Sequence, residues 1–158
     1  VLPRSDSSEI RKALSMENSF VPASQAGATQ GSIEGRTYLV VEDEALVGLE
    51  LMSILEDFRA EALGPATTVE DALVRIERGG FDGAFLDGNL QGRTVGEVAA
   101  ALTQRNIPFV FVSGYGRENL PLGFGNARIV SKPFTPQEIL DAAEAMTKRD
   151  RKVVRLRS

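Results

Sequence analysis

The sequence predicts an α/β fold in which a doubly wound, five-stranded parallel sheet is covered by helices on both faces. Short apolar runs alternate along the chain with segments of helical periodicity, which is typical of successive βαβ units. The runs are apolar at consecutive positions, as in strands that are buried on both faces. The chain has 158 residues, 42% of them hydrophobic, which suits one domain with a substantial core.

The five expected strands are apolar runs of four to six residues. Three are clear, and two, the second and the last, are weaker. In chain order they are Tyr38–Val41, Ala60–Leu63, Gly83–Leu86, Ile107–Val112 and Arg128–Ser131.

Helical patterns separate these strands. They cover Glu44–Phe58, Val69–Arg78, Val95–Gln104 and Pro136–Lys148. In the first we expect an inward stripe of apolar side chains, formed by Leu46, Leu49, Met52 and Leu55. Thr68 is the expected N-cap of the second helix, and Thr135, followed by Pro136 and Glu138, predicts a capping box for the last.

The segment Arg117–Ala127 stands where a further helix would complete the alternation. It contains Pro121, Gly123 and Gly125, which oppose a stable helix. We therefore expect a loop there, with the fourth helix weak or missing.

Two flanking segments differ from the expected domain at residues 37–147. Residues 1–36 resemble an interdomain linker, with the spacing of one or two helical turns at Ser8–Leu14. Ile33-Glu34-Gly35-Arg36 also resembles a protease-cleavable fusion site, and the two interpretations stay open. Residues 148–158 carry six bases and one acid, and we expect a solvated basic tail.

The composition excludes several kinds of chemistry. The absence of His and Cys removes catalytic triads, thiol nucleophiles, disulfides and Cys- or His-ligated zinc. The net charge of −4 argues against binding nucleic acid through bulk charge. The sequence contains no apolar run long enough to cross a membrane, and its start lacks the layout of a signal peptide. A cytoplasmic protein is the expectation.

Polar side chains follow four of the expected strands. They are Glu42, Asp43, Asp87, Ser113 and Lys132. Ligands of open parallel sheets bind beyond the carboxyl ends of the strands, so these groups are expected at one edge. Each alone is also a common cap or turn residue, but their joint placement favours a site.

The charges of residues 37–147 support that interpretation. This range contains 17 acids and 8 bases, and Lys132 is its only lysine. A lone ammonium group beside three carboxylates offsets part of their mutual repulsion, and a divalent metal ion would offset the rest.

Four motifs give the chain a resemblance to the receiver domain of two-component response regulators. They begin at Val41, Phe85, Phe111 and Ser131, and read Val-Glu-Asp-Glu, Phe-Leu-Asp-Gly-Asn-Leu, Phe-Val-Ser-Gly and Ser-Lys-Pro-Phe. The interval of 44 residues between Asp43 and Asp87 also fits. The resemblance covers residues 37–147 and implies a flavodoxin-like fold with strand order 2-1-3-4-5.

The resemblance also implies a role for each residue. Asp87 matches the phosphoacceptor, a carboxylate nucleophile that becomes an aspartyl phosphate. Glu42 and Asp43, with Asp87 and the backbone carbonyl of Asn89, match the ligands of a Mg²⁺ ion. Lys132 matches the lysine that pairs with the phosphoryl oxygens.

Three further residues fit the family pattern, and the first of them reports phosphorylation. Ser113 matches the hydroxyl that moves to bond the phosphoryl group. Gly114 keeps the approach to Asp87 open, and Pro133 stands where the family has a cis Lys-Pro peptide bond.

The sequence departs from the family pattern at three positions. Gln91 replaces the usual Pro four residues after the phosphoacceptor, and Ile129 replaces the aromatic switch residue. Tyr115 instead follows Ser113 by two residues, in a stretch similar to FATGUY-type receivers and to receivers associated with HWE-type histidine kinases. Tyr115 and the segment 114–127 are thus candidates for the switch; a packed loop aromatic is the alternative.

The resulting hypothesis is a phosphoacceptor domain, either a stand-alone regulator or the C-terminal receiver of a hybrid histidine kinase. Because the chain has no His, its phosphodonor would be a separate histidine kinase or histidine phosphotransfer domain. It would catalyse only its own phosphorylation and dephosphorylation, with a protein as downstream partner and homodimerisation open. The alternatives are a magnesium-dependent phosphohydrolase, disfavoured because Asn89 stands where an acid is needed, and a receiver-fold binding module that takes no phosphate.

Overall fold

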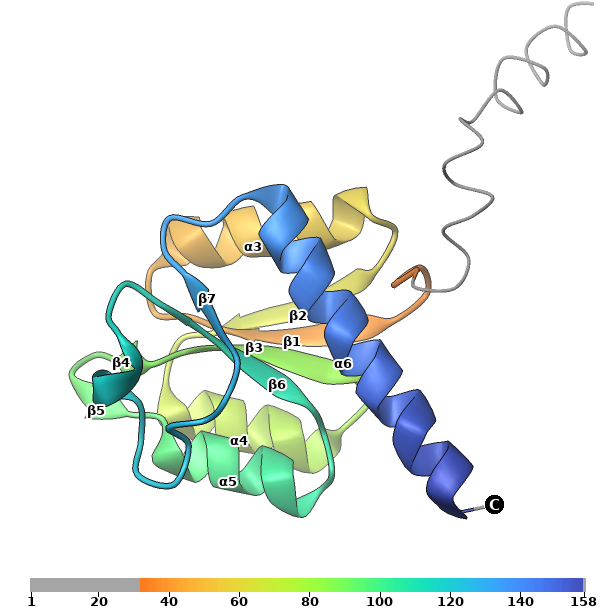
Figure 1. Cartoon of the computed structure of the whole chain (residues 1–158). Helices are drawn as coiled ribbons and strands as arrows, with labels where there is room; N and C mark the ends of the chain where they lie inside the picture. The colour runs from red at the N-terminus through yellow and green to blue at the C-terminus, as the bar shows by residue number, and fades with distance from the viewer. Residues whose placement is uncertain (1–31, 158) are drawn as a thin grey trace, which may run out of the picture. The chain divides into compact units, whose positions relative to one another are not determined.

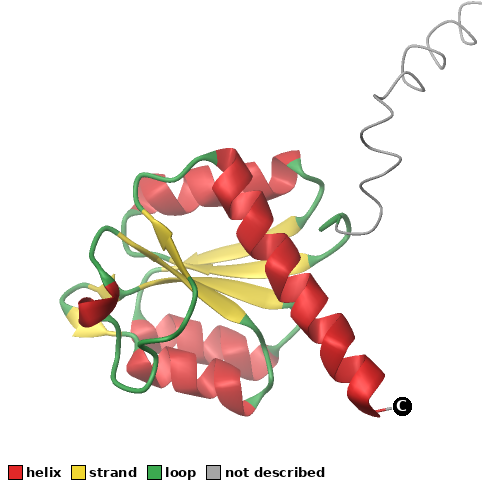
Figure 2. Cartoon of the chain, viewed as in Figure 1, coloured by secondary structure: helices red, strands yellow, loops and turns green. Residues whose placement is uncertain are grey.

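The computed structural model describes residues 32–157 and the side chains of residues 32–147. The main strands and α-helices of these residues mostly alternate along the chain, except that β7 follows β6 without an α-helix between them (Figures 1 and 2). They are β1 (Thr37–Val41), α3 (Ala45–Asp57), β2 (Glu61–Ala66), α4 (Val69–Arg78), β3 (Gly83–Asp87), α5 (Gly96–Gln104), β6 (Phe109–Ser113), β7 (Ile129–Ser131) and α6 (Pro136–Arg157).

The five long strands form one parallel sheet in the order β2-β1-β3-β6-β7. This confirms the expected order 2-1-3-4-5. In the centre of the sheet, Val41 of β1 pairs with Leu86 of β3, and Leu86 pairs with Phe111 of β6. The carboxyl ends of these strands therefore meet at one edge.

Helices cover both faces of the sheet, with α3 and α6 on one side and α4 and α5 on the other (Figure 1). Two apolar cores result. Leu55 and Ile139 belong to the first, with Phe85 of β3, and Ile76 and Leu102 belong to the second. Strands buried on both faces need apolar side chains at successive positions, which is why their sequences lack polar alternation.

The inward face of α3 differs from the expected one. Leu46 and Leu49 are 83% and 56% exposed, and the buried residues are Gly48, Leu51, Ile54 and Leu55. The helix approaches β2 at Gly48, where an added Cβ would lie 3.0 Å from the Cβ of Pro65. Because Gly48 faces β2 in this contact, Leu46 and Leu49 lie on the exposed side of the helix.

The folded unit begins earlier than residue 37. Ile33 is buried in the core, and the backbone N–H of Gly35 donates to the carbonyl of Arg59 at 3.0 Å. Residues 33–36 therefore belong to the compact unit and not to the expected linker. The helical turn expected at Ser8–Leu14 lies outside the described residues.

The last helix is longer than expected. α6 begins after Thr135, whose hydroxyl accepts from the Glu138 backbone N–H at 3.2 Å, and continues to Arg157 instead of ending at Lys148. The basic segment is thus helical backbone up to Arg157, which agrees with the helix propensity of Lys and Arg and with the preference for cations near a helix C-terminus.

The segment Arg117–Ala127 contains one 3₁₀ turn, Arg117–Asn119, and no α-helix, as expected. It is nevertheless held to the domain. The Arg117 guanidinium donates to the carbonyls of Gly125 and Ala127 at 3.2 and 2.7 Å, and the Phe124 ring packs edge-on against Phe111.

Among the described residues, no helix is both long and apolar enough to span a membrane.

Candidate functional site

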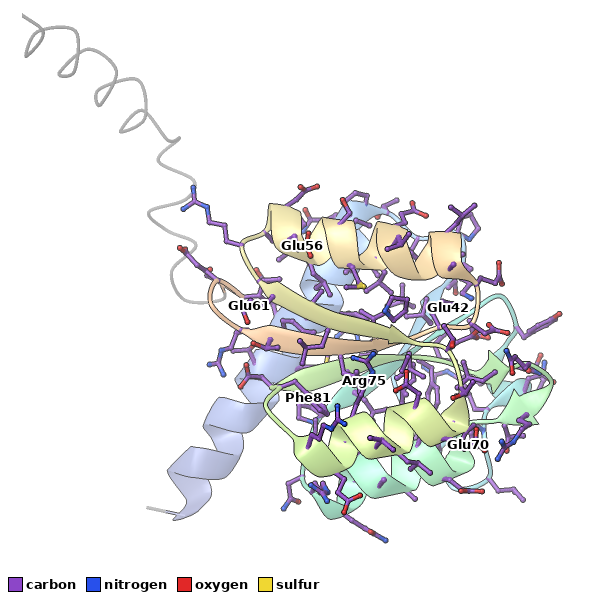
Figure 3. All side chains as sticks on the ribbon, turned by 180° about the vertical axis from the view of Figure 1, so that it is seen from behind. Glu42, Glu56, Glu61, Glu70, Arg75 and Phe81 are labelled. Atoms are coloured by element: carbon purple, nitrogen blue, oxygen red, sulfur yellow. The ribbon has the colours of Figure 1, made fainter. Side chains whose placement is uncertain are left out.

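The sheet topology brings the predicted polar residues to one edge. Glu42 and Asp43 directly follow β1, while Asp87 and Ser113 are the last residues of β3 and β6. Lys132 follows β7, and its backbone N–H donates to the carbonyl of Ser113 at 2.9 Å. In Figure 3, Glu42 lies at the end of the sheet opposite to Glu61, which starts β2.

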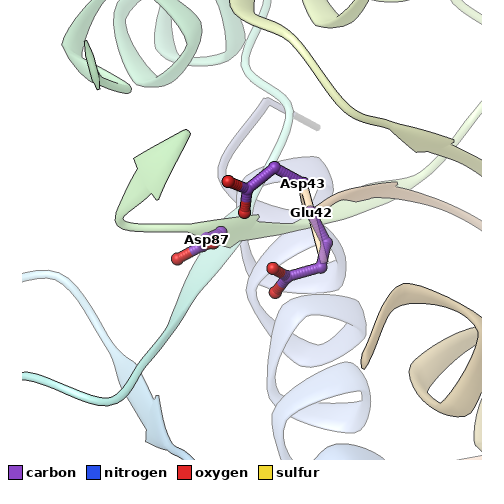
Figure 4. A group of neighbouring side chains, drawn as sticks. All are labelled: Glu42, Asp43 and Asp87. Atoms are coloured by element: carbon purple, nitrogen blue, oxygen red, sulfur yellow. The ribbon is translucent and has the colours of Figure 1, made fainter. Parts of the chain in front are cut away.

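Three carboxyl groups gather at this edge (Figure 4). One oxygen atom from each of Glu42, Asp43 and Asp87 lies within 4.8 Å of the others. Glu42 is 1% exposed and Asp87 is 7% exposed, whereas Asp43 is half-buried. Carboxylate oxygens are the ligands that Mg²⁺ prefers, so the donor set fits a hard divalent cation.

Lys132 provides the cation of this cluster. Its Nζ lies 2.8 Å from Glu42 Oε2, 3.7 Å from Asp87 Oδ2 and 3.9 Å from Glu44 Oε1. The peptide bond between Lys132 and Pro133 is cis, as expected. The ammonium group therefore neutralises Glu42 most directly and reaches Asp87 less closely.

The unequal distances from Lys132 to the two carboxylates are consistent with the pKa shifts of Asp87 and Lys132. Burial, followed by the adjacent Glu42 carboxylate, raises the pKa of Asp87 to about 8, although the Lys132 ammonium opposes the shift. For Lys132, burial lowers the pKa, but Glu42, Asp87 and Glu44 outweigh it and the pKa is raised. The lysine is thus held as a cation.

Asp43 has a different environment. Burial raises its pKa, but the hydrogen bond from the Gln91 backbone N–H and contacts with its neighbours outweigh this effect, so its pKa is lowered. The bond between Gln91 N and Asp43 Oδ2 is 3.0 Å long. The cluster therefore combines one carboxyl group that favours its proton with one that favours its charge.

Ser113 lies beside the backbone that follows Asp87. A Cβ added to Gly88 would lie 3.6 Å from Ser113 Oγ, whereas one added to Gly114 would meet nothing within 4 Å. Ser113 Oγ accepts from the Tyr115 backbone N–H at 3.1 Å. The approach past Gly114 is open, as expected.

Tyr115 itself is 69% exposed. The alternative of a packed loop aromatic is therefore wrong. Its ring lies on the surface, and its backbone N–H, which donates to Ser113 Oγ, links it to the cluster.

A short hairpin after β3 was not expected from the sequence. β4 (Asn89–Leu90) and β5 (Arg93–Thr94) form an antiparallel pair. The Asn89 backbone N–H donates to Asp87 Oδ1 at 3.3 Å. The glycine at position 92, directly after Gln91, was the available indication of a tight turn. The Asn89 carbonyl stays a predicted metal ligand.

Comparisons with known proteins agree with this geometry. The receiver domain of the response regulator PhyR from Erythrobacter litoralis shares the fold, with a TM-score of 0.64 at 21% identity over 74% of this chain and 93% of that one. SdrG from Sphingomonas melonis Fr1 is 37% identical, with a TM-score of 0.64 over 73% of this chain and 98% of that one. The chain belongs to the response-regulator receiver family.

A longer relative matches the same receiver. Nodulation protein W of Bradyrhizobium diazoefficiens is 30% identical in a 142-residue alignment that covers 81% of this chain and 58% of that protein. The receiver thus spans little more than half the length of that protein. No family model matches the chain.

The raised pKa of Asp87 predicts a pH-dependent stability in metal-free buffer. Between its ordinary pKa of 3.8 and about 8, the unfolded chain has ionised this carboxyl group while the folded receiver keeps the proton. The unfolded state then binds fewer protons, so the free energy of unfolding falls as pH rises, by at most about 1.4 kcal/mol per pH unit for one group.

Urea unfolding with EDTA at about pH 5 and about pH 7.5 measures this slope. In Asp87→Asn, the decrease of the unfolding free energy between the two pH values should be smaller, because the contribution of Asp87 is lost. In Asp57→Asn, a substitution at an exposed aspartate, the decrease should equal that of the parent. Identical slopes in the parent and Asp87→Asn would contradict the assignment.

Proposed function

We propose that the receiver is a phosphoacceptor in a two-component phosphorelay and that Asp87 takes the phosphoryl group from a phosphohistidine of a kinase or phosphotransfer domain. The observation that supports this most is the placement of Asp87. Its carboxyl group ends the central strand β3, lies beside the Glu42 and Asp43 carboxylates, and is 3.7 Å from the Lys132 ammonium.

In the proposed reaction, an oxygen of ionised Asp87 attacks the phosphorus atom. An O–P bond forms and the N–P bond of the phosphohistidine breaks, with the electron pair leaving on the imidazole nitrogen. Phosphoryl transfer depends mainly on positioning and on positive charge near the phosphoryl oxygens. Lys132 supplies such a charge, because its raised pKa keeps it protonated.

Glu42, Asp43 and Asp87, with the Asn89 carbonyl, would hold Mg²⁺. Such an ion neutralises charge on the phosphoryl oxygens and favours the ionised form of Asp87. The three carboxylates supply oxygen ligands of the required kind within 4.8 Å of each other. Water attack on the aspartyl phosphate would return the receiver to its resting state.

Ser113 and Tyr115 form the proposed switch. The Ser113 hydroxyl would donate to a phosphoryl oxygen on Asp87, and its Oγ already accepts from the Tyr115 backbone N–H. A shift of Ser113 would therefore move Tyr115, whose exposed ring is available to a protein partner. The stretch Phe-Val-Ser-Gly-Tyr-Gly that contains them supports the proposal that the receiver is of the FATGUY type.

Phosphorylation in the presence of magnesium tests the function. After incubation with Mg²⁺ and acetyl phosphate or phosphoramidate, intact mass should increase by one phosphoryl group in the parent and in Asp57→Asn, but not in Asp87→Asn. Omitting Mg²⁺ should slow the gain strongly, because Lys132 is then the single cation among the described residues that offsets the charge of the three carboxylates and the incoming phosphoryl group.

The other outcomes identify the rival functions. Turnover of a small phosphomonoester without a lasting phospho-form would indicate a phosphohydrolase. No mass gain with any donor, including a phosphorylated histidine phosphotransfer domain, would indicate a binding module and contradict the proposal.

A second prediction addresses the switch. Ser113→Ala should still accept phosphate at Asp87, but it should abolish most of the phosphorylation-dependent change in the Tyr115 amide chemical shift, because the link through the hydroxyl is lost. Ser113→Thr, which keeps the hydroxyl, is the matched control. NMR spectra before and after phosphorylation measure the shift, and an equal change in Ser113→Ala and the parent would rule out this route.

A further inference from the structure

The β4–β5 hairpin has a tight two-residue turn. Leu90 pairs with Arg93 across it, which leaves Gln91 and Gly92 at the turn with φ angles of +52° and +79°. Positive φ at both central residues defines a type I′ turn. Proline cannot occupy the Gln91 position in this turn, because its ring fixes φ near −65° and it has no N–H group.

Three contacts fix this turn on the domain. The Leu90 side chain is 1% exposed and belongs to the core beneath α4 and α5. The Arg93 guanidinium pairs with Glu70 in the first turn of α4, the end of that helix labelled in Figure 3. Within the turn, the Gly92 N–H donates to Asn89 Oδ1 at 2.8 Å.

The fixed turn directs one backbone donor at the acidic cluster. The Gln91 N–H donates to Asp43 Oδ2 at 3.0 Å, although the residues are 48 positions apart. A carboxylate that accepts such a bond at one oxygen is restricted in rotation, and its other oxygen stays available to a cation. Groups that orient a metal ligand in this way strengthen metal binding.

We propose that Gln91 is a positioning residue for the cation site and that its backbone N–H, held by the hairpin, orients Asp43 for Mg²⁺. The inference rests on the proposed magnesium site and adds a determinant of its affinity. The Gln91 side chain is not required, because only the backbone donor and the positive φ enter the argument.

Two substitutions at this position separate the backbone from the side chain. Gln91→Pro removes the N–H and the turn conformation, whereas Gln91→Gly keeps both. Loss of an orienting partner typically weakens metal binding by about 10- to 100-fold. We expect Gln91→Pro to raise the Mg²⁺ dissociation constant by about 10-fold and Gln91→Gly to leave it within about 2-fold, measured by isothermal titration calorimetry.

The phosphorylation rate gives a second readout that general damage to the fold would not reproduce. In Gln91→Pro the rate with acetyl phosphate should be low at limiting Mg²⁺ and should approach the parent rate at saturating Mg²⁺. Equal Mg²⁺ affinity in Gln91→Pro and the parent would overturn the inference alone. No Mg²⁺ binding by the parent would overturn the proposed function as well.

A measurement on metal-free protein covers the case in which Gln91→Pro does not fold. Because Gln91 is exposed, its amide should exchange slowly with solvent only through the bond to Asp43. In Asp43→Ala the exchange of this amide should accelerate, while that of the Gly92 amide, bonded to Asn89, should not. Unchanged exchange of the Gln91 amide would overturn the inference.

Discussion

Glu42 and Asp87 are buried beside one ammonium group, that of Lys132, and this shortage of positive charge governs the edge of the sheet on which they lie. Buried carboxylates are costly unless they are paired or protonated. Lys132 approaches Glu42 to 2.8 Å and Asp87 only to 3.7 Å, and the pKa of Asp87 rises accordingly. In the absence of a metal ion the proton on Asp87 relieves the imbalance, and a bound cation would replace it.

The surrounding elements give each carboxyl group a separate environment. The Glu42 side chain lies beneath the start of α3, where an added Cβ on Gly48 would be 3.6 Å from Glu42 Cβ. The hairpin supplies a backbone donor to Asp43, while the space at Gly114 is open on the Ser113 side. The open approach therefore lies on the side of Asp87, the group proposed to react, while Glu42 and Asp43, which are proposed to hold the metal ion together with Asp87, contact neighbouring elements.

Much of this arrangement could be predicted from the sequence, because apolar strands and the polar residues that follow them have a strong pattern. Periodicity located the helices but not the inward face of α3, because an apolar stripe on the surface has the same spacing as one in the core. The inward face is set by the close approach of Gly48 to Pro65, which the sequence pattern does not show. The bond from Gln91 to Asp43 was not predictable either, because it depends on a turn that brings together residues 48 positions apart. The extension of α6 to Arg157 agrees with the helix propensity of Lys and Arg. It was not predicted, because a run of basic residues is also typical of a solvated tail.

Trapping the phosphorylated residue tests the central claim most directly. The receiver would be incubated with Mg²⁺ and a phosphorylated histidine phosphotransfer domain, reduced with borohydride, which converts an aspartyl phosphate to homoserine, and mapped by peptide mass spectrometry. We expect homoserine at position 87 and at no other aspartate, with matching loss of phosphohistidine from the donor. Phosphate loss from the donor with Asp87 unmodified, or homoserine at Asp43 instead, would contradict it.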